Sequence, residues 1–152
     1  MEDRETSFRA RVWKIWLVMI VLGLGFAATH KAMAAEEQDR SASQAVIEAQ
    51  LKAFQNDDAP SAFKLASPSV QRLFRDPNTF VTMVKRDYSV VYRPSSVQFV
   101  KFQSQGPRVI HAVQMVDQNM VLWNVYYLLE KFPKGEWRIS SCDIEKAAID
   151  LI

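Results

Sequence analysis

The sequence predicts an α+β fold in which short helices come first and an antiparallel sheet follows. Between residues 41 and 87, apolar residues recur at helical spacing, and prolines that follow capping residues divide this region into short pieces. After Tyr88 the pattern changes to runs rich in β-branched and aromatic residues, separated by short breaks. Helices grouped before strands favour packing of the helices on one face of a curved sheet of about four strands.

A leader precedes this domain. Basic residues come before an apolar run of 14 residues, 15–28, and the small residues Ala32 and Ala34 follow it. This is the pattern of an export signal that is cleaved after Ala34. As a helix the run spans roughly 21 Å, less than the ~30 Å hydrocarbon core, but residues 12–13 extend it to the lower limit for a membrane helix. Two interpretations stay open: a cleaved signal over 1–34 that releases a periplasmic domain, or an uncleaved anchor that holds the domain outside the inner membrane.

The helices of the domain are expected in order. Residues 35–40 have no apolar periodicity and are interpreted as a tether, so that 41–152 form a single domain. A capping box of Ser41 and Gln44 predicts the start of the first helix, which should end at residues 56–58. Three further helix starts are predicted where a capping side chain comes just before a proline: Asp58 with Pro60, Ser67 with Pro68, and Asp76 with Pro77.

Four strands are expected over residues 97–102, 108–116, 120–131 and 136–143, and the short breaks between them predict an antiparallel meander. The third strand is apolar on both faces, although an antiparallel sheet usually exposes one face to water. Helices should therefore cover one face, and a pocket, a dimer partner or a membrane the other. The candidate residues for a ligand pocket or an interface are Tyr88, Tyr92, Gln114, Asn124, Tyr126, Leu128 and Arg138.

The charge balance and the single histidine limit the classes of function to consider. Residues 35–152 carry 14 Lys and Arg against 14 Asp and Glu, so the basic pI comes from the leader and does not indicate nucleic-acid binding. Residues 64–93 hold six basic and two acidic residues, which form either an anion-binding patch or solvated helix faces. His111 is the only histidine after residue 34, so neither a metal site nor a cofactor is expected, and we interpret it as a strand histidine.

Candidate catalytic groups are few. Asp57-Asp58 is the one acidic pair that could act as acid and base, but its place at a helix junction favours capping. Cys142 is the only cysteine, and lone strand cysteines are more often buried than reactive. Strict alternation in the last strand puts Trp137, Ile139 and Ser141 on one side and Arg138, Ser140 and Cys142 on the other.

The order of several segments makes a resemblance recognisable. These segments are Val46–Phe54, Asp57-Asp58, Ala62-Phe63, Ala66–Pro68, Phe80, Met83-Val84, Tyr92–Pro94 and Trp137–Ile139 with Cys142. Together they resemble a family of small exported bacterial proteins known only as a domain of unknown function, DUF4864, which implies a periplasmic domain and supplies no catalytic residues. The element order is more distantly similar to the cone-shaped fold of nuclear transport factor 2 and ketosteroid isomerase, which implies a cone-like sheet.

These observations favour a non-enzymatic exported module that binds a small apolar ligand or a protein partner, including a second copy, through the second face of its sheet. Two alternatives stay open. One is a cone-fold enzyme, an isomerase or hydrolase, that uses Tyr and Asp groups in a pocket. The other is an envelope subunit anchored by an uncut leader. Membrane contact is expected only through the N-terminal helix, if it is not cleaved.

Overall fold

The computed structural model describes residues 31–148 of the 152-residue chain. The chain divides into two compact units, Met1–Gln38 and Asp39–Ile152. In the first unit the described residues 31–38 are helical and exposed, and they include Ala32 and Ala34 of the predicted cleavage site. The predicted apolar run 15–28 lies outside the described residues. No helix within residues 31–148 is long and apolar enough to cross a membrane.

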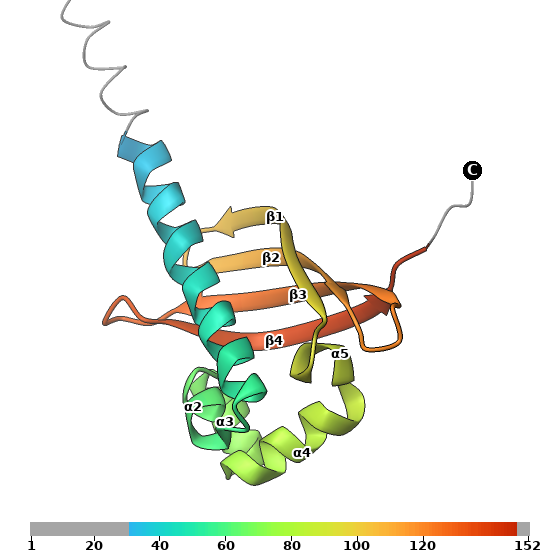
Figure 1. The fold of residues 1–152 in the computed structure, drawn as a ribbon. Coiled ribbons are helices and arrows are strands. Elements are labelled where there is room, and N and C mark those ends of the chain that lie inside the picture. Colours follow the sequence, from blue (N-terminus) through green and yellow to red (C-terminus); the bar gives the residue numbers. More distant parts are fainter. Residues whose placement is uncertain (1–30, 149–152) are drawn as a thin grey trace, which may run out of the picture. The chain divides into compact units, whose positions relative to one another are not determined.

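The second unit confirms the predicted fold class. Its helices lie on one face of a twisted antiparallel sheet (Figure 1). After a helix that ends at residue 55 come four short helices, and then four strands in sequence order. The helices are α2 (Ala59–Lys64), α3 (Pro68–Phe74), α4 (Pro77–Asp87) and α5 (Ser89–Tyr92). The strands are β1 (Ser96–Gln105), β2 (Arg108–Val116), β3 (Leu122–Lys131) and β4 (Trp137–Lys146).

The three predicted helix starts are confirmed. The Asp58 carboxylate accepts a hydrogen bond from the backbone N–H of Ser61 at 3.0 Å, at the start of α2. Ser67 caps α3, and Asp76 caps α4 through the N–H of Thr79 at 2.9 Å. In all three helices a proline occupies the first or second helical position, where its missing N–H costs nothing.

The first helix differs from the prediction at its beginning. Residues 31–55 are all helical, so the predicted start at Ser41 is wrong and residues 35–40 are not an irregular tether. Residues 32–38 consist of Ala, Met, Glu and Gln, which are strong helix formers and carry the helix past the capping signal. The Ser43 hydroxyl lies within the helix and donates to the carbonyl of Asp39 at 2.6 Å. The predicted end is confirmed, because Asp57 adopts a left-handed φ of 55°.

The sheet contains two β-bulges that set which side chains face the helices. One lies between Phe99 and Lys101 of β1, and the other opposite Leu128 and Leu129. At the second bulge Leu128 pairs with Ser141 but Leu129 pairs with Ile139, which leaves Ser140 as the extra residue.

The predicted alternation of the last strand is therefore wrong beyond the bulge. Trp137 and Ile139 are buried against the helices, and Cys142, which pairs with the buried Tyr127, faces the helices as well. Ser141 pairs with Leu128 and shares its face. One extra residue has exchanged the two sides of the strand.

The core lies between the helices and the inner face of the sheet. The predicted stripe of the first helix, Ile47, Leu51 and Phe54, is buried there. His111 is also buried, as a strand residue, with its Nε2 2.7 Å from the Ser43 hydroxyl. Because the one proton of Ser43 is donated to Asp39, we assign the donor in this contact to His111 Nε2–H. Cross-strand pairing forms a row over the inner face: Phe102, His111, Tyr127 and Cys142.

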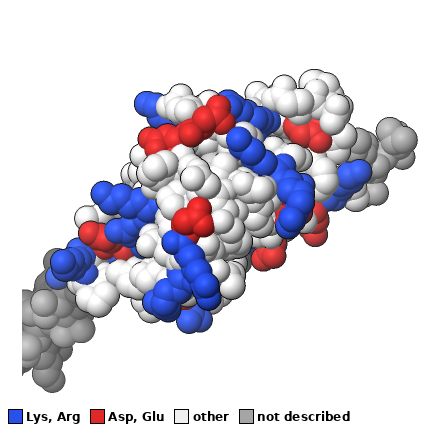
Figure 2. Space-filling view, turned by 90° about the horizontal axis from the view of Figure 1, so that it is seen from below, with Lys and Arg blue, Asp and Glu red and all other residues white. Residues whose placement is uncertain are grey.

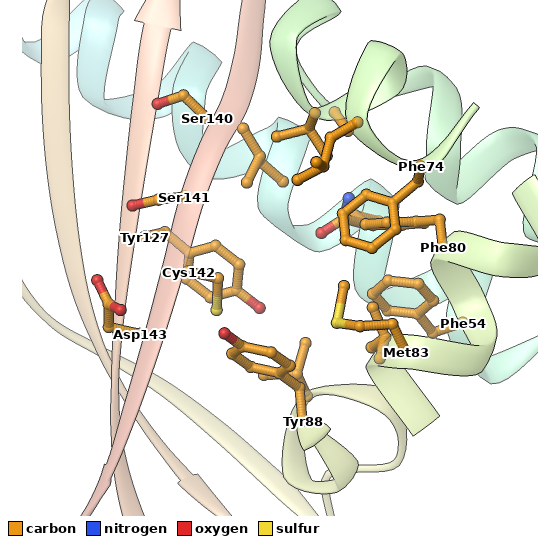
Figure 3. A pocket seen from close by; sticks show the side chains of 17 residues that line it. Phe54, Phe74, Phe80, Met83, Tyr88, Tyr127, Ser140, Ser141, Cys142 and Asp143 are labelled. Atoms are coloured by element: carbon orange, nitrogen blue, oxygen red, sulfur yellow. The ribbon is translucent and has the colours of Figure 1, made fainter. Parts of the chain in front are cut away.

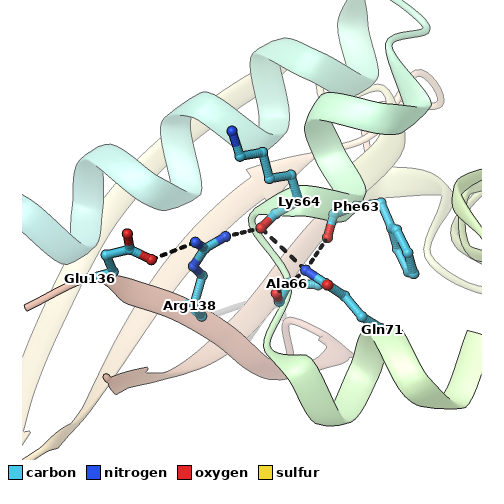
Figure 4. A network of polar contacts seen from close by, with 6 residues as sticks. All are labelled: Phe63, Lys64, Ala66, Gln71, Glu136 and Arg138. Carbon is cyan, nitrogen blue, oxygen red and sulfur yellow. Dashed lines mark hydrogen bonds and ion pairs between the residues drawn. The ribbon is translucent and has the colours of Figure 1, made fainter. Parts of the chain in front are cut away.

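The edge of β4 is covered where the chain passes from α2 to α3. Ile139 exchanges backbone hydrogen bonds with this link, donating to Leu65 at 3.0 Å and accepting from Ser67 at 2.8 Å. Two side chains hold the link in place (Figure 4). The Arg138 guanidinium donates to the Lys64 carbonyl at the end of α2. The Gln71 amide donates to the Ala66 carbonyl of the link at 2.9 Å and shares its other hydrogen between the carbonyls of Phe63 and Lys64.

Several basic residues of 64–93 pair with neighbouring carboxylates. Figure 2 shows Lys and Arg side chains in separate groups with acidic side chains among them, rather than as one continuous patch. Arg86 pairs with Asp87 at 2.7 Å, and Arg93 pairs with Asp57 at 2.7 Å. These neighbouring carboxylates offset the positive charge locally.

Candidate functional site

A pocket of about 310 Å³ opens between β4 and the helices. Its walls come from the first helix, α3, α4, α5 and the middle of β4, so they unite segments far apart in the sequence. Leu73 is 73% exposed and lies at the rim. The apolar lining includes five aromatic or sulfur-containing side chains from the helices: Phe54, Phe74, Phe80, Met83 and Tyr88 (Figure 3).

Three polar groups converge inside this apolar pocket. The hydroxyls of Tyr127 and Tyr88 and the thiol of Cys142 point toward one another (Figure 3). The Tyr127 side chain has no exposed surface, and among the described residues its hydroxyl has no hydrogen-bond partner. The Cys142 thiol is its cross-strand neighbour, but the two groups do not meet hydrogen-bond geometry. A hydroxyl without a partner in the core is rare in folded proteins.

The local fold explains why these three groups meet. Tyr127 faces the helices because alternation along β3 puts it on the same side as the buried residues Val125 and Leu129. The bulge at Ser140 turns Cys142 to the same side. Tyr88 lies at the junction of α4 and α5, where it leaves the helical conformation with φ −129° and ψ 45°. The α4–α5 corner thus brings Tyr88 over β4.

All three groups stay protonated near neutral pH. Burial raises the pKa of Tyr127 well above its ordinary value, and burial also raises the pKa of Tyr88. Burial, with a smaller effect of the Asp143 carboxylate, raises the pKa of Cys142 to about 12. A thiol with this pKa is scarcely ionised and is a poor nucleophile. The pocket therefore presents neutral O–H and S–H groups.

The predicted site residues fall into three places. Tyr88 lines the pocket. Tyr92 is buried beside it in the core, where its hydroxyl donates to the Asp57 carboxylate and its ring packs on Phe54. Arg138 holds the α2–α3 link through the carbonyl of Lys64. The side chains of Tyr92 and Arg138 therefore stabilise the fold and do not line the pocket.

The other four candidates lie on the outer face of the sheet. Gln114 pairs with Asn124 across β2 and β3, with their amides 3.5 Å apart. The Tyr126 hydroxyl donates to the Glu145 carboxylate at 2.8 Å, and Leu128 is half-buried next to it. The structure brings these four residues together on one face, but it separates them from Tyr88.

Sequence reasoning missed Tyr127, Cys142 and the phenylalanines of the pocket. Alternation along β3 puts Tyr127 on the same face as Val125 and Leu129, and a tyrosine among aliphatic residues is a signal of a polar group in the core. The discriminator for the enzyme alternative is a carboxylate near a tyrosine hydroxyl in a pocket. The hydrogen-bonded pairs of this kind, Tyr92 with Asp57 and Tyr126 with Glu145, lie outside the pocket.

Metal ligands do not gather in the described part of the chain. Within residues 31–148 no three His, Cys, Asp or Glu side chains lie close enough to hold a metal ion.

Helices pack on the inner face of a four-stranded antiparallel sheet, with a pocket between the two layers, and this arrangement has the fold of NTF2-like proteins. A crystal structure of an NTF2-like protein of unknown function from Shewanella baltica OS155 has a TM-score of 0.50 and 11% identity, and the match covers 74% of this chain and 96% of that one. An NTF-2-like protein of unknown function from Silicibacter pomeroyi DSS-3 has 16% identity and a TM-score of 0.49, with 73% and 98% covered. Identities this low show the fold alone.

The chain belongs to the family described as Domain of unknown function (DUF4864), which matches residues 36–150. Both resemblances predicted from the sequence are thereby confirmed. No curated protein matches the chain.

Proposed function

We propose that the domain binds a small, largely apolar molecule in the pocket between β4 and the helices and does not convert it. The observation that carries this proposal is the hollow itself. The pocket is open at its rim and measures about 310 Å³, and it lies beside the buried hydrophobic core. Its size falls at the lower end of the range for small-molecule sites, about 300–1,000 Å³.

The character of the walls supports the same proposal. Small-molecule sites combine apolar and aromatic walls with a few convergent polar groups. Here Phe54, Phe80 and Met83 supply the first, and Tyr88 and Tyr127 supply the second. The Cys142 thiol stays neutral, and the Asp143 carboxylate is turned away from the pocket. Both observations favour binding over catalysis.

This pocket lies on the inner face of the sheet, whereas the sequence suggested the second face. The outer face supports binding of an apolar ligand or a second copy less well, because polar side chains interrupt its apolar residues. The Tyr126 side chain is 37% exposed, but Asp143 is its partner on β4 and its hydroxyl donates to the Glu145 carboxylate. Gln114 and Asn124 form part of the next cross-strand row. An interface between proteins tolerates such polarity, so a partner on this face remains the second candidate.

We also propose that the domain works outside the cytoplasmic membrane, on the evidence of the basic leader, the apolar run 15–28 and the residues Ala32 and Ala34. The full gene should be expressed in a bacterium and the chain recovered separately from periplasm and membranes for mass measurement. A chain that begins at Ala35 in the periplasm supports the cleaved signal. An intact chain in the membrane fraction supports the anchor, and an intact chain in the cytoplasm contradicts both.

Binding can be tested with N-phenyl-1-naphthylamine, a neutral dye that fluoresces in apolar sites. The wild-type protein should bind it saturably with a stoichiometry of one. Met83 points into the pocket, so Met83→Trp should fill the pocket and abolish the signal. Thr82→Trp places the same side chain on the exposed side of α4 and should leave dye binding unchanged.

Two results contradict the proposed function. One is an absence of saturable dye binding by the wild-type protein. The other is equal dye binding by wild type and by Met83→Trp, when circular dichroism shows that both are folded. Val70→Phe, which narrows the pocket from α3, provides a second filling variant if Met83→Trp does not fold.

A further inference from the structure

We infer that the ligand of this pocket is a neutral molecule that presents a hydrogen-bond acceptor, such as a ketone or ester carbonyl, to the buried hydroxyl of Tyr127. The inference rests on the proposed function, because it assumes that a ligand occupies the pocket. It adds the chemical class of that ligand and the end by which the ligand enters.

The need for an acceptor follows from the Tyr127 hydroxyl. This hydroxyl lies at the pocket, has no exposed surface, and meets no accepting oxygen or nitrogen among the described residues. Its polar neighbours, the hydroxyl of Tyr88 and the thiol of Cys142, can each donate or accept, but neither meets hydrogen-bond geometry with it among the described residues. The Cys142 sulfur is a weak acceptor, so its interaction with the Tyr127 hydroxyl satisfies that hydroxyl poorly. A ligand atom with a lone pair would satisfy the group that the fold leaves without a partner.

The neutrality of the ligand follows from the charges of the walls. Among the residues that the structure describes, no Lys, Arg or His lines the pocket. Asp143 is the one charged lining residue in this part of the chain, and Figure 3 shows its side chain on the opposite side of β4 from Cys142. A buried carboxylate or phosphate would therefore lose its hydration without gaining a cation. A buried cation would likewise lose its hydration without gaining an anionic partner, because the Asp143 carboxylate is turned away.

The orientation of the ligand follows from the same arrangement. The donors lie deep, where Tyr127 is fully buried, whereas Leu73 at the rim is exposed and apolar. The acceptor end should enter first and the apolar body should then contact the phenylalanines of α3 and α4. Phe74 and Phe80 already pack edge to face with ring centroids 5.5 Å apart, which gives a flat ring a defined surface.

Three naphthalene probes of similar size distinguish the effect of a hydrogen-bond acceptor from the effects of charge and of apolar contact. 2-Acetylnaphthalene carries a neutral acceptor, 2-ethylnaphthalene carries none, and 2-naphthoate is an anion. Each is titrated against the dye-loaded protein, in wild type, in Tyr127→Phe and in Tyr126→Phe. The control residue Tyr126 lies on the outer face, and its hydroxyl bonds to Glu145.

Tyr127→Phe should weaken 2-acetylnaphthalene about fivefold, the effect of one ordinary hydrogen bond. It should leave 2-ethylnaphthalene unchanged or slightly tighter, so that the loss depends on the acceptor and not on the shape of the pocket. Tyr126→Phe should change neither. In the wild-type protein, 2-naphthoate should bind at least tenfold more weakly than the ketone.

Equal effects of Tyr127→Phe on the ketone and on the hydrocarbon overturn the inference, as does tighter binding of 2-naphthoate than of the ketone. In either case the dye still binds and the proposed function stands. If neither the dye nor any naphthalene binds the wild-type protein, the proposed function fails and the inference fails with it. Dye binding by Tyr127→Phe also verifies that this variant is folded.

Discussion

Replacing Tyr127 by phenylalanine should make the ligand-free protein more stable, whereas removal of a hydrogen-bonded tyrosine hydroxyl normally destabilises a protein. The perturbation is one oxygen atom, because the ring and its rotamer are retained. In the native state that oxygen is fully buried and has no hydrogen-bond partner within residues 31–148. In the unfolded state it is hydrated. Folding therefore costs the hydration of a polar group and returns no hydrogen bond.

The size of the effect follows from this exchange. A buried polar group left without a partner costs about 1–3 kcal/mol. Loss of one atom from the wall of an existing pocket removes few contacts, worth roughly 0.5 kcal/mol at ~0.1–0.2 kcal/mol for each atom pair. The expected net gain in the free energy of unfolding is about 1–2 kcal/mol. For a domain of this length, that gain corresponds to a rise in Tm of roughly 5 °C.

Urea unfolding followed by circular dichroism measures the change directly. The protein must first be unfolded and refolded to strip any retained ligand, because a ligand that binds the Tyr127 hydroxyl stabilises only the wild type. Tyr126→Phe and Tyr92→Phe are matched controls, since their hydroxyls bond to Glu145 and Asp57. Tyr92→Phe should lower the free energy of unfolding by about 1 kcal/mol. Tyr126→Phe should lower it less, because the hydrogen bond from Tyr126 to Glu145 is exposed. Equal m-values are required for the comparison.

A lower free energy of unfolding for ligand-free Tyr127→Phe, by about 1 kcal/mol or more, refutes the reasoning. It would mean that the hydroxyl has a partner in the native state, such as an ordered water. The argument that the pocket needs an acceptor from its ligand would then lose its basis.

Two further predictions concern the other buried groups. Burial, and secondarily the charge of Arg40, lowers the pKa of His111 to about 4. The native state therefore binds a proton less readily than the unfolded state. The stability present above pH 6.5 is lost as the pH falls toward 4. Between pH 7.5 and pH 5 the free energy of unfolding should fall by roughly 2 kcal/mol in wild type and not in His111→Leu, as measured by urea unfolding at each pH. If the free energies of the two proteins changed in parallel with pH, the prediction would be contradicted. Cys142, with a pKa of about 12, should react with iodoacetamide at pH 8 at least a hundredfold more slowly in the native protein than in urea, and similar rates in both would show that the thiol is not held neutral.

Local patterns in the sequence were enough to predict the order of elements. Asp58, Ser67 and Asp76 each act on backbone groups within three residues, so each helix start is encoded where it occurs. The strands follow from β-branched and aromatic runs in the same way. The early start of the first helix was missed because the strong helix propensity of residues 32–38 outweighs a capping signal that can also be accommodated inside a helix.

The pocket was decided by contacts between residues far apart in the chain. One extra residue at Ser140 reverses the faces of β4, and only the pairing with Leu128 and Leu129 reveals where the extra residue lies. That reversal sets Cys142 beside Tyr127, and the α4–α5 corner then adds Tyr88. The sequence alone therefore determined the α+β class, the helix caps and the leader pattern, which depend on near neighbours. The tertiary structure alone decided which face carries the pocket and which hydroxyl lacks a partner, because register and burial arise only when distant segments pack.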